Sequence, residues 1–155
     1  MHKILISVAL AVLAAGPLAA SENADVVAAI QGVVDAFNKG DTKAVVAAST
    51  DEMCIIDEFP PYEWHGAGTC SKWLADYDAD SKKNGITDGK VTIGKPRHVN
   101  VTGDRAYVVV PTDYTFKQNG KSMREIASTW TFTLQKIDGN WKVTGWAWAK
   151  LVRTM

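Results

Sequence analysis

The 155-residue sequence lacks most of the features that would place it in a specialised class of protein. It has no block of like charge, no low-complexity segment and no internal repeat, and its 17 basic residues balance its 17 acidic ones. Without a basic patch, it lacks the electrostatic footprint of a nucleic-acid-binding protein. Only three histidines are present, and no motif arranges them with carboxylates or cysteines as metal ligands. We therefore expect no nucleic-acid partner, no metal and no cofactor.

Long apolar runs are also missing, apart from one near the N-terminus. Residues 1–3 form a short basic head, residues 4–15 are apolar, and residues 16–20 are mostly small. This pattern is typical of a secretory signal peptide. The apolar run is shorter than the roughly 20 residues of a membrane-spanning helix. We expect residues 1–20 to be removed near Ala20, which predicts a periplasmic or secreted protein. Residues 21–155 then form one domain that does not contact the membrane.

Cysteine is scarce, because only Cys54 and Cys70 are present. In an oxidising compartment the two can form a disulfide, whose loop of about 16 residues would contribute roughly 3 kcal/mol through chain entropy. The alternative is a pair of reduced, buried thiols. The sequence leaves both possibilities open.

Helical spacing and stop signals predict three helices in the first half of the chain. Apolar residues recur at helical intervals over residues 24–39, and a short second helix covers residues 43–48. A strand over residues 53–58 follows and ends before two prolines. The third helix opens within residues 66–69 and stops at the Asn84-Gly85 pair.

The remainder of the chain is typical of an antiparallel meander. Strands are predicted over residues 91–101, 104–117, 123–137 and 141–152, with a glycine and a proline interrupting the first. The pairs Asn119-Gly120 and Asp138-Gly139 separate alternating segments, and such pairs are strong hairpin signals.

The last strand carries bulky residues at positions of both parities. Trp141 and Val143 alternate to one face, whereas Trp146 and Trp148 alternate to the other unless Gly145 introduces a bulge. Either a bulge redirects the tryptophans, or a second subunit covers that face. On this basis we expect a homodimer.

This order of elements, together with three local marks, resembles a known superfamily. The marks are residues 38–41 after the first helix, residues 51–57 with the following Gly66, and residues 138–143 near the end. The chain resembles the nuclear-transport-factor-2-like superfamily, which includes SnoaL-like polyketide cyclases and ketosteroid isomerases. The resemblance implies an α+β fold, with three N-terminal helices packed in a curved antiparallel sheet that forms a cone with an apolar pocket.

Asp57 is the first candidate catalytic residue. Residues 50–57 are similar to the base-bearing strand of the steroid isomerases, and the resemblance implies that Asp57 is a general base. A carboxylate in an apolar cavity has a raised pKa and is a better base. However, residues 24–39 hold no tyrosine and residues 127–136 no acidic residue, so the two donors that steroid isomerases use for the enolate are missing. Steroid isomerase activity itself is therefore not expected.

His65 and Asp113 are the other catalytic candidates. His65 precedes the third helix and can reach the pocket mouth as an acid–base group, or it can simply hydrogen-bond a loop. Asp113 shares a strand face with Tyr107 and Val109, where it is either a second pocket acid or a residue at the sheet rim.

Large aromatic residues supply the candidate ligand-binding positions. Six tryptophans are present, and they either line a pocket for an apolar or aromatic molecule or fill the cone. The candidates are Tyr62, Trp64, Trp73, Trp130, Trp146 and Trp148.

Two classes of function follow, and we expect the first, because a lone carboxylate without visible oxyanion donors is an incomplete active site. The first is an exported protein that binds a small apolar or aromatic molecule. The second is a cofactor-free isomerase, lyase or cyclase with Asp57 as its general base. A packed interior would instead indicate an interaction module.

Overall fold

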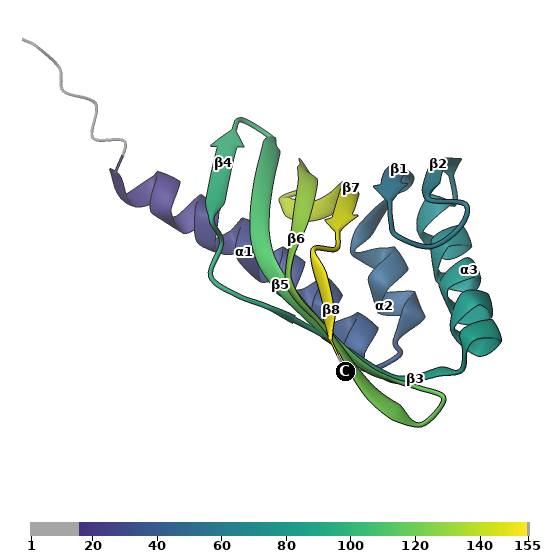
Figure 1. Ribbon diagram of the computed structural model, residues 1–155. Helices are drawn as coiled ribbons and strands as arrows, with labels where there is room; N and C mark the ends of the chain where they lie inside the picture. The colour runs from purple at the N-terminus through teal and green to yellow at the C-terminus, as the bar shows by residue number, and fades with distance from the viewer. Residues whose placement is uncertain (1–15, 155) are drawn as a thin grey trace, which may run out of the picture.

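The structure is a computed structural model that describes residues 16–154, with side chains described for residues 21–151. Three helices lie on one side of a single curved sheet, and α1 runs diagonally behind the long strands (Figure 1). The helices are α1 (Gly16–Asn38), α2 (Thr42–Ala47) and α3 (Thr69–Asn84). The strands are β1 (Ser49–Ile56), β2 (Glu63–Ala67), β3 (Ile86–Ile93), β4 (His98–Thr102), β5 (Arg105–Gln118), β6 (Lys121–Ile137), β7 (Asn140–Ala149) and β8 (Val152–Thr154).

The sheet has the strand order β2-β1-β7-β6-β5-β3, with β4 paired to β5 and β8 paired to β6. This confirms the predicted α+β class with three helices and a curved sheet. One feature of the prediction is wrong, because β1 pairs with β7 in parallel and the sheet is mixed. All of α3 and the meander lie between these two strands, so no hairpin constrains their relative direction.

The two predicted hairpin turns are confirmed by their backbone conformation. Asn119 and Gly120 have φ values of 50° and 79°, and Asp138 and Gly139 have 49° and 80°. Positive φ at both central residues is the requirement of the type I′ turn, which asparagine, aspartate and glycine meet at low cost.

Three segments differ from the sequence prediction. Residues 63–67, expected as a loop, form β2 and pair with β1. This strand is short and only Trp64 in it is buried, so it carries no alternating pattern. The strand predicted over residues 141–152 ends at Ala149, and β8 pairs separately with β6. The predicted strand 91–101 is divided between β3 and β4.

A bulge in β7 resolves the problem of its two bulky faces. Thr133 of β6 pairs with Gly145, but Leu134 pairs with Val143, so β7 holds one extra residue here. Trp141, Val143 and Trp146 are consequently all buried, with exposures of 8%, 0% and 5%. Of the two alternatives that the sequence left open, the bulge at Gly145 is present. No second subunit is needed to bury these tryptophans, and the homodimer stays a prediction.

Gly145 is required where β7 passes closest to β1. A Cβ at Gly145 would lie 2.6 Å from the backbone oxygen of Cys54, which cannot move without shifting β1. We expect Gly145→Ala to lower the free energy of unfolding by about 2 kcal/mol, measured by urea unfolding. Gly32→Ala is the matched control, because a Cβ there meets nothing within 4 Å and helix propensity predicts a gain of up to about 1 kcal/mol. An unchanged Gly145→Ala variant would contradict the close approach of these strands.

The core lies between α1 and the concave face of the sheet. Val26, Ile30 and Val34 of α1 are almost completely buried against the strands, where Phe132 and Leu134 of β6 are buried equally well.

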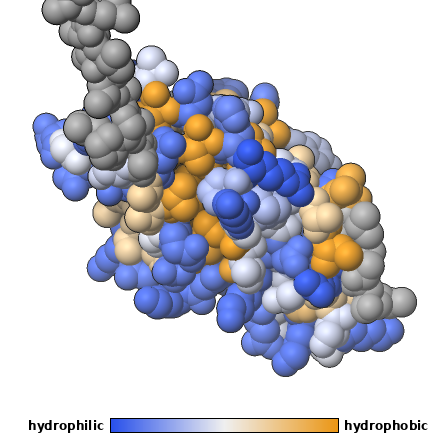
Figure 2. All heavy atoms as spheres, turned by 90° about the vertical axis from the view of Figure 1, so that its left-hand side faces the viewer, coloured by the Kyte–Doolittle hydropathy of each residue, from blue (hydrophilic) through white to orange (hydrophobic). Residues whose placement is uncertain are grey.

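On the outside, Figure 2 shows the face that carries the start of α1 and β4, with a band of apolar side chains among charged ones. Among the described residues, no helix is both long and apolar enough to cross a membrane. The predicted signal peptide lies largely outside these residues.

Candidate functional site

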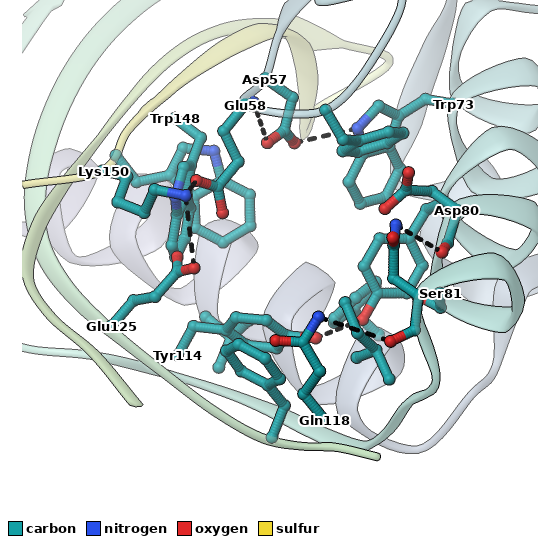
Figure 3. Close-up of a pocket in the computed structure, with 18 residues that line it drawn as sticks. Asp57, Glu58, Trp73, Asp80, Ser81, Tyr114, Gln118, Glu125, Trp148 and Lys150 are labelled. Atoms are coloured by element: carbon teal, nitrogen blue, oxygen red, sulfur yellow. Dashed lines mark hydrogen bonds and ion pairs between the residues drawn. The ribbon is translucent and has the colours of Figure 1, made fainter. Parts of the chain in front are cut away.

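A cavity of about 260 Å³ remains between α3 and the concave face of the sheet. Its walls come from α1, α3, β3, β5, β6 and β7 and from the segment after β1 (Figure 3). Eight of its 18 lining side chains are aromatic. The tryptophans therefore do not fill the interior, and of the two alternatives the filled cone is excluded.

Asp57 is positioned at the edge of this cavity by the alternation of β1. Met53 and Ile55 point into the core, so the next residue of the same parity also points inward. The backbone N–H of Glu58 donates to Oδ1 of Asp57 at 2.7 Å, and the indole N–H of Trp73 donates to Oδ2 at 3.0 Å. Burial raises the pKa of Asp57 from 3.8 to about 6, although both hydrogen bonds oppose the rise. The result is a carboxylate that is ionised at neutral pH and unusually basic.

Two tyrosines form a hydrogen-bonded pair across the cavity from Asp57. The hydroxyls of Tyr77 on α3 and Tyr114 on β5 lie 2.7 Å apart, and Figure 3 shows Tyr114 on the opposite side of the opening from Asp57. Burial raises the pKa of both phenols, so both remain protonated. A Cβ at Gly89 would lie 2.7 Å and 2.9 Å from the two phenol oxygens, so only glycine fits behind the pair. Sequence reasoning missed this pair, whose only signal was the position of Tyr77 four residues after Trp73.

A lysine and two glutamates form a charged cluster on the side of the cavity beside Trp148 (Figure 3). The Nζ atom of Lys150 contacts Glu58 and lies 3.6 Å from Oε1 of Glu125, which is only 2% exposed. Strand alternation from Asp57 would turn Glu58 to the opposite face, toward solvent. Because β1 ends at Ile56, strand alternation no longer governs Glu58.

A bulge in β6 explains why Glu125 faces the cavity and Asp113 does not. Thr112 pairs with Ser128 and Tyr114 with Glu125, so two residues of β6 oppose Asp113 alone. Asp113 accepts a hydrogen bond from the backbone N–H of Ala127 at 3.2 Å and one from Arg124 at 2.6 Å. The hydrogen bond from Arg124 holds the pKa of Asp113 below its usual range. Asp113 thus stabilises the bulge on the outer face, and its expected place as a pocket acid is corrected.

The sequence comparison agrees with this architecture. The SnoaL-like domain family matches residues 26–147, which is most of the chain. The chain belongs to the SnoaL-like domain family. Comparison with curated proteins gives no match.

Solved structures with the same fold extend this SnoaL-like assignment. A ketosteroid isomerase-like protein from Erwinia carotovora atroseptica is 24% identical, with a TM-score of 0.66 over 84% of this chain and 97% of its own. A Kribbella flavida protein is 12% identical, with a TM-score of 0.73 over 88% and 95% of the two chains. A hexachlorocyclohexane dehydrochlorinase is 11% identical, with a TM-score of 0.70 over 88% of each chain. At these identities the likeness shows the fold, and together with the family match it confirms the predicted superfamily.

The SnoaL-like domain brings Asp57 together with three of the expected tryptophans. Trp73, Trp130 and Trp148 line the cavity with it. Trp146 does not line the cavity and packs edge-on against Trp73 and Trp130 from behind. It therefore supports the aromatic wall.

The other expected site residues lie outside the cavity lining. The indole N–H of Trp64 donates to Oδ2 of Asp76 at 2.7 Å and so links β2 to α3. Tyr62 is 58% exposed in the turn before β2. His65 is exposed on β2, where its register partner is Cys54. Alternation of β2 turns His65 away from buried Trp64, so the expected place of His65 at the pocket mouth is corrected.

Both cysteines of the SnoaL-like domain are free. Cys54 is exposed on β1, whereas Cys70 is buried in the first turn of α3. Of the two possibilities left open by the sequence, the disulfide is not formed. Burial raises the pKa of the Cys70 thiol, which therefore stays protonated. Within residues 21–151, no group of three or more histidine, cysteine or acidic side chains is placed to hold a metal ion.

Proposed function

We propose that this SnoaL-like domain binds a small apolar or aromatic molecule in its cavity and acts on it as a cofactor-free isomerase or lyase, with Asp57 as the general base. The observation that carries the proposal is a buried carboxylate with a pKa of about 6 at the edge of an aromatic cavity. Two solved structures of the same fold are named as ketosteroid isomerase-like and as a dehydrochlorinase, which accords with proton transfer at carbon.

The environment of Asp57 suits a base better than a structural ion. Its two hydrogen-bond donors are a backbone amide and an indole, both neutral, so no described cation pairs with it directly. A base is most effective when its pKa lies close to the working pH. A carboxyl with a pKa of about 6 therefore combines a high ionised fraction with a strong drive to accept a proton.

The Tyr77–Tyr114 pair supplies the donor that the sequence seemed to lack. One of its two hydroxyl protons forms the bond between the tyrosines, which leaves the other to donate outside the pair. With a carbonyl compound between Asp57 and the pair, Asp57 takes a proton from the carbon beside the carbonyl, and the electron pair moves to the oxygen. The enolate oxygen accepts the tyrosine hydrogen bond. Asp57 then returns the proton to another carbon, or a leaving group departs.

The cavity limits the size of the molecule. A volume of about 260 Å³ is at the small end for ligand pockets and suits a molecule of one or two rings. The indole N–H groups of Trp130 and Trp148 have no hydrogen-bond partner among the described residues, which favours an acceptor on the ligand. We also propose that the protein is exported through the signal peptide predicted in residues 1–20 and that it forms a homodimer.

Deuterium exchange of an enolisable aromatic ketone tests this function. With 2-tetralone in D2O, we expect the protein to accelerate exchange of the α-protons above the buffer rate and to saturate with ketone, as followed by proton NMR. Binding is measured in parallel from the quenching of tryptophan fluorescence, since the probe would contact Trp73. If the ketone binds but its α-protons do not exchange faster than in buffer, the proposed binding function is supported and the proposed catalytic function is refuted. Absence of both would contradict the proposal.

A further inference from the structure

The cavity has an excess of negative charge that apolar binding does not explain. Among the residues whose side chains are described, four acidic ones line it, against one basic residue, Lys150. They are Asp57, Glu58, Asp80 and Glu125. An enclosed site of this sign favours a cation and disfavours an anion.

The charges are not evenly distributed around the opening. Lys150 lies with Glu58 and Glu125 on one side, where the positive charge is already matched. Asp57 and Asp80 lie on the other side, next to Trp73 (Figure 3). Neither of these two carboxylates forms an ion pair with any residue whose side chain is described. The uncompensated charge is therefore concentrated on the α3 side.

Aromatic rings on the same side add a second attraction for a cation. Trp73, Tyr77 and Asp80 are spaced by four and three residues on α3, so they share one face of the helix. The rings of Trp73 and Tyr77 are stacked, with centroids 5.5 Å apart at 21°, and Phe59 meets both at about 6 Å. The π-faces of such rings attract ammonium groups, most strongly where water is excluded.

We propose that the molecule that binds this cavity is a cation, with a protonated amine or a quaternary ammonium held between Asp80 and the Trp73–Tyr77 wall. The rest of the molecule, with its hydrogen-bond acceptor, lies toward Trp130 and Trp148. Asp80 is the counter-ion of the ligand, which leaves Asp57 free to exchange a proton. This inference rests on the proposed function only in that the cavity takes a small molecule.

Three probes of nearly equal shape separate charge from apolar contact. They are benzyltrimethylammonium, the neutral alcohol 2-methyl-1-phenyl-2-propanol and the anion 2,2-dimethyl-3-phenylpropanoate. We expect benzyltrimethylammonium to bind the mature protein at least tenfold more tightly than the alcohol in calorimetric titrations at low ionic strength. The anion is expected to bind most weakly. The advantage of the cation should shrink as salt is added.

Two charge-removing variants localise the effect. Asp80→Asn should weaken binding of benzyltrimethylammonium about tenfold and leave the alcohol unchanged. Asp78→Asn is the matched control, because it removes the same charge from the same helix at an exposed residue that does not line the cavity. It should change the affinity less than twofold. Thermal unfolding confirms that both variants are folded.

Each other outcome overturns the inference in a distinguishable way. Equal or tighter binding of the alcohol or the anion refutes the cationic ligand but keeps the small-molecule site. If Asp80→Asn and Asp78→Asn weaken binding of the cation equally, the cation is bound by the overall negative charge of the domain. The proposed site at Asp80 is then refuted. If none of the three probes binds, both the inference and the proposed binding function fail.

Discussion

Replacing Asp57 by asparagine is expected to stabilise the protein by about 2 kcal/mol at pH 8. A carboxyl whose pKa rises from 3.8 to about 6 on folding makes folding less favourable by about 3 kcal/mol once it is ionised. The lost acceptor for the indole N–H of Trp73 offsets about 1 kcal/mol of this. Urea unfolding of the two proteins at several pH values measures the difference.

The pH dependence gives this prediction its sign. Because the folded pKa lies above the unfolded one, stability falls in the wild-type protein as pH rises from about 4 through about 6. The advantage of Asp57→Asn should therefore disappear on acidification toward pH 4, where Asp57 is protonated when folded. If the stability advantage of Asp57→Asn over the wild type is no larger at pH 8 than at pH 4, the idea that Asp57 is desolvated is contradicted.

The same substitution should remove proton transfer. General-base catalysis contributes about 10²–10⁴-fold in rate, so exchange on 2-tetralone is expected to fall at least 100-fold in Asp57→Asn. Asp113→Asn is the matched control, since its carboxylate pairs with Arg124 on the outer face and should leave the rate unchanged. A gain in stability combined with a loss of activity is characteristic of a functional residue kept at a cost to the fold.

Lys150→Met is expected to lower the free energy of unfolding by about 2 kcal/mol at pH 7. The substitution removes the cation that lies between Glu58 and Glu125, and Glu125 is almost fully buried. Breaking a buried ion pair from one side costs more than the pair itself contributes, because a carboxylate remains in a poorly solvated place. Urea unfolding measures the loss.

A second substitution tests whether buried charge is the cause. Adding Glu125→Gln to Lys150→Met removes the charge left behind and should recover more than half of the lost stability. If the two substitutions destabilise additively, Lys150 acts through its aliphatic packing and not through its charge.

Much of the fold follows from local signals in the sequence. Asn-Gly and Asp-Gly pairs specify their turns because few other residues accept positive φ at low cost. Alternation along β1 correctly turned Asp57 inward, since a buried strand fixes which side chains face the core. Gly145 similarly marked the bulge in β7 that a regular strand could not have accommodated.

The rest of the site depends on irregularities that have no local signal. The bulge in β6 occurs at Ala127, which has a φ of 57°. Because no glycine stands at this position, the sequence does not indicate a positive φ. This bulge reverses the alternation, so Glu125 turns inward, whereas Asp113, one of the candidate pocket acids, lies opposite the bulge on the outer face. Glu58 turns inward only because β1 has ended.

Other contacts across the cavity join residues far apart in the chain. Tyr77 meets Tyr114, and Lys150 meets Glu58, only after α3 and the meander have packed. Patterns within one segment determine which face a residue occupies, but not which residue from another element it meets. The site is therefore a property of tertiary packing, whereas the inward orientation of Asp57 can be predicted from one strand.

The most direct test of the account is an NMR titration of the Asp57 side-chain carboxyl in the mature protein, with Asp57→Asn to assign the signal. The account predicts a pKa near 6, set by burial at the edge of the cavity. A value at or below the ordinary 3.8 would show a solvated or strongly hydrogen-bonded carboxylate. Asp57 would then be a structural residue, and the proposed general base would be refuted.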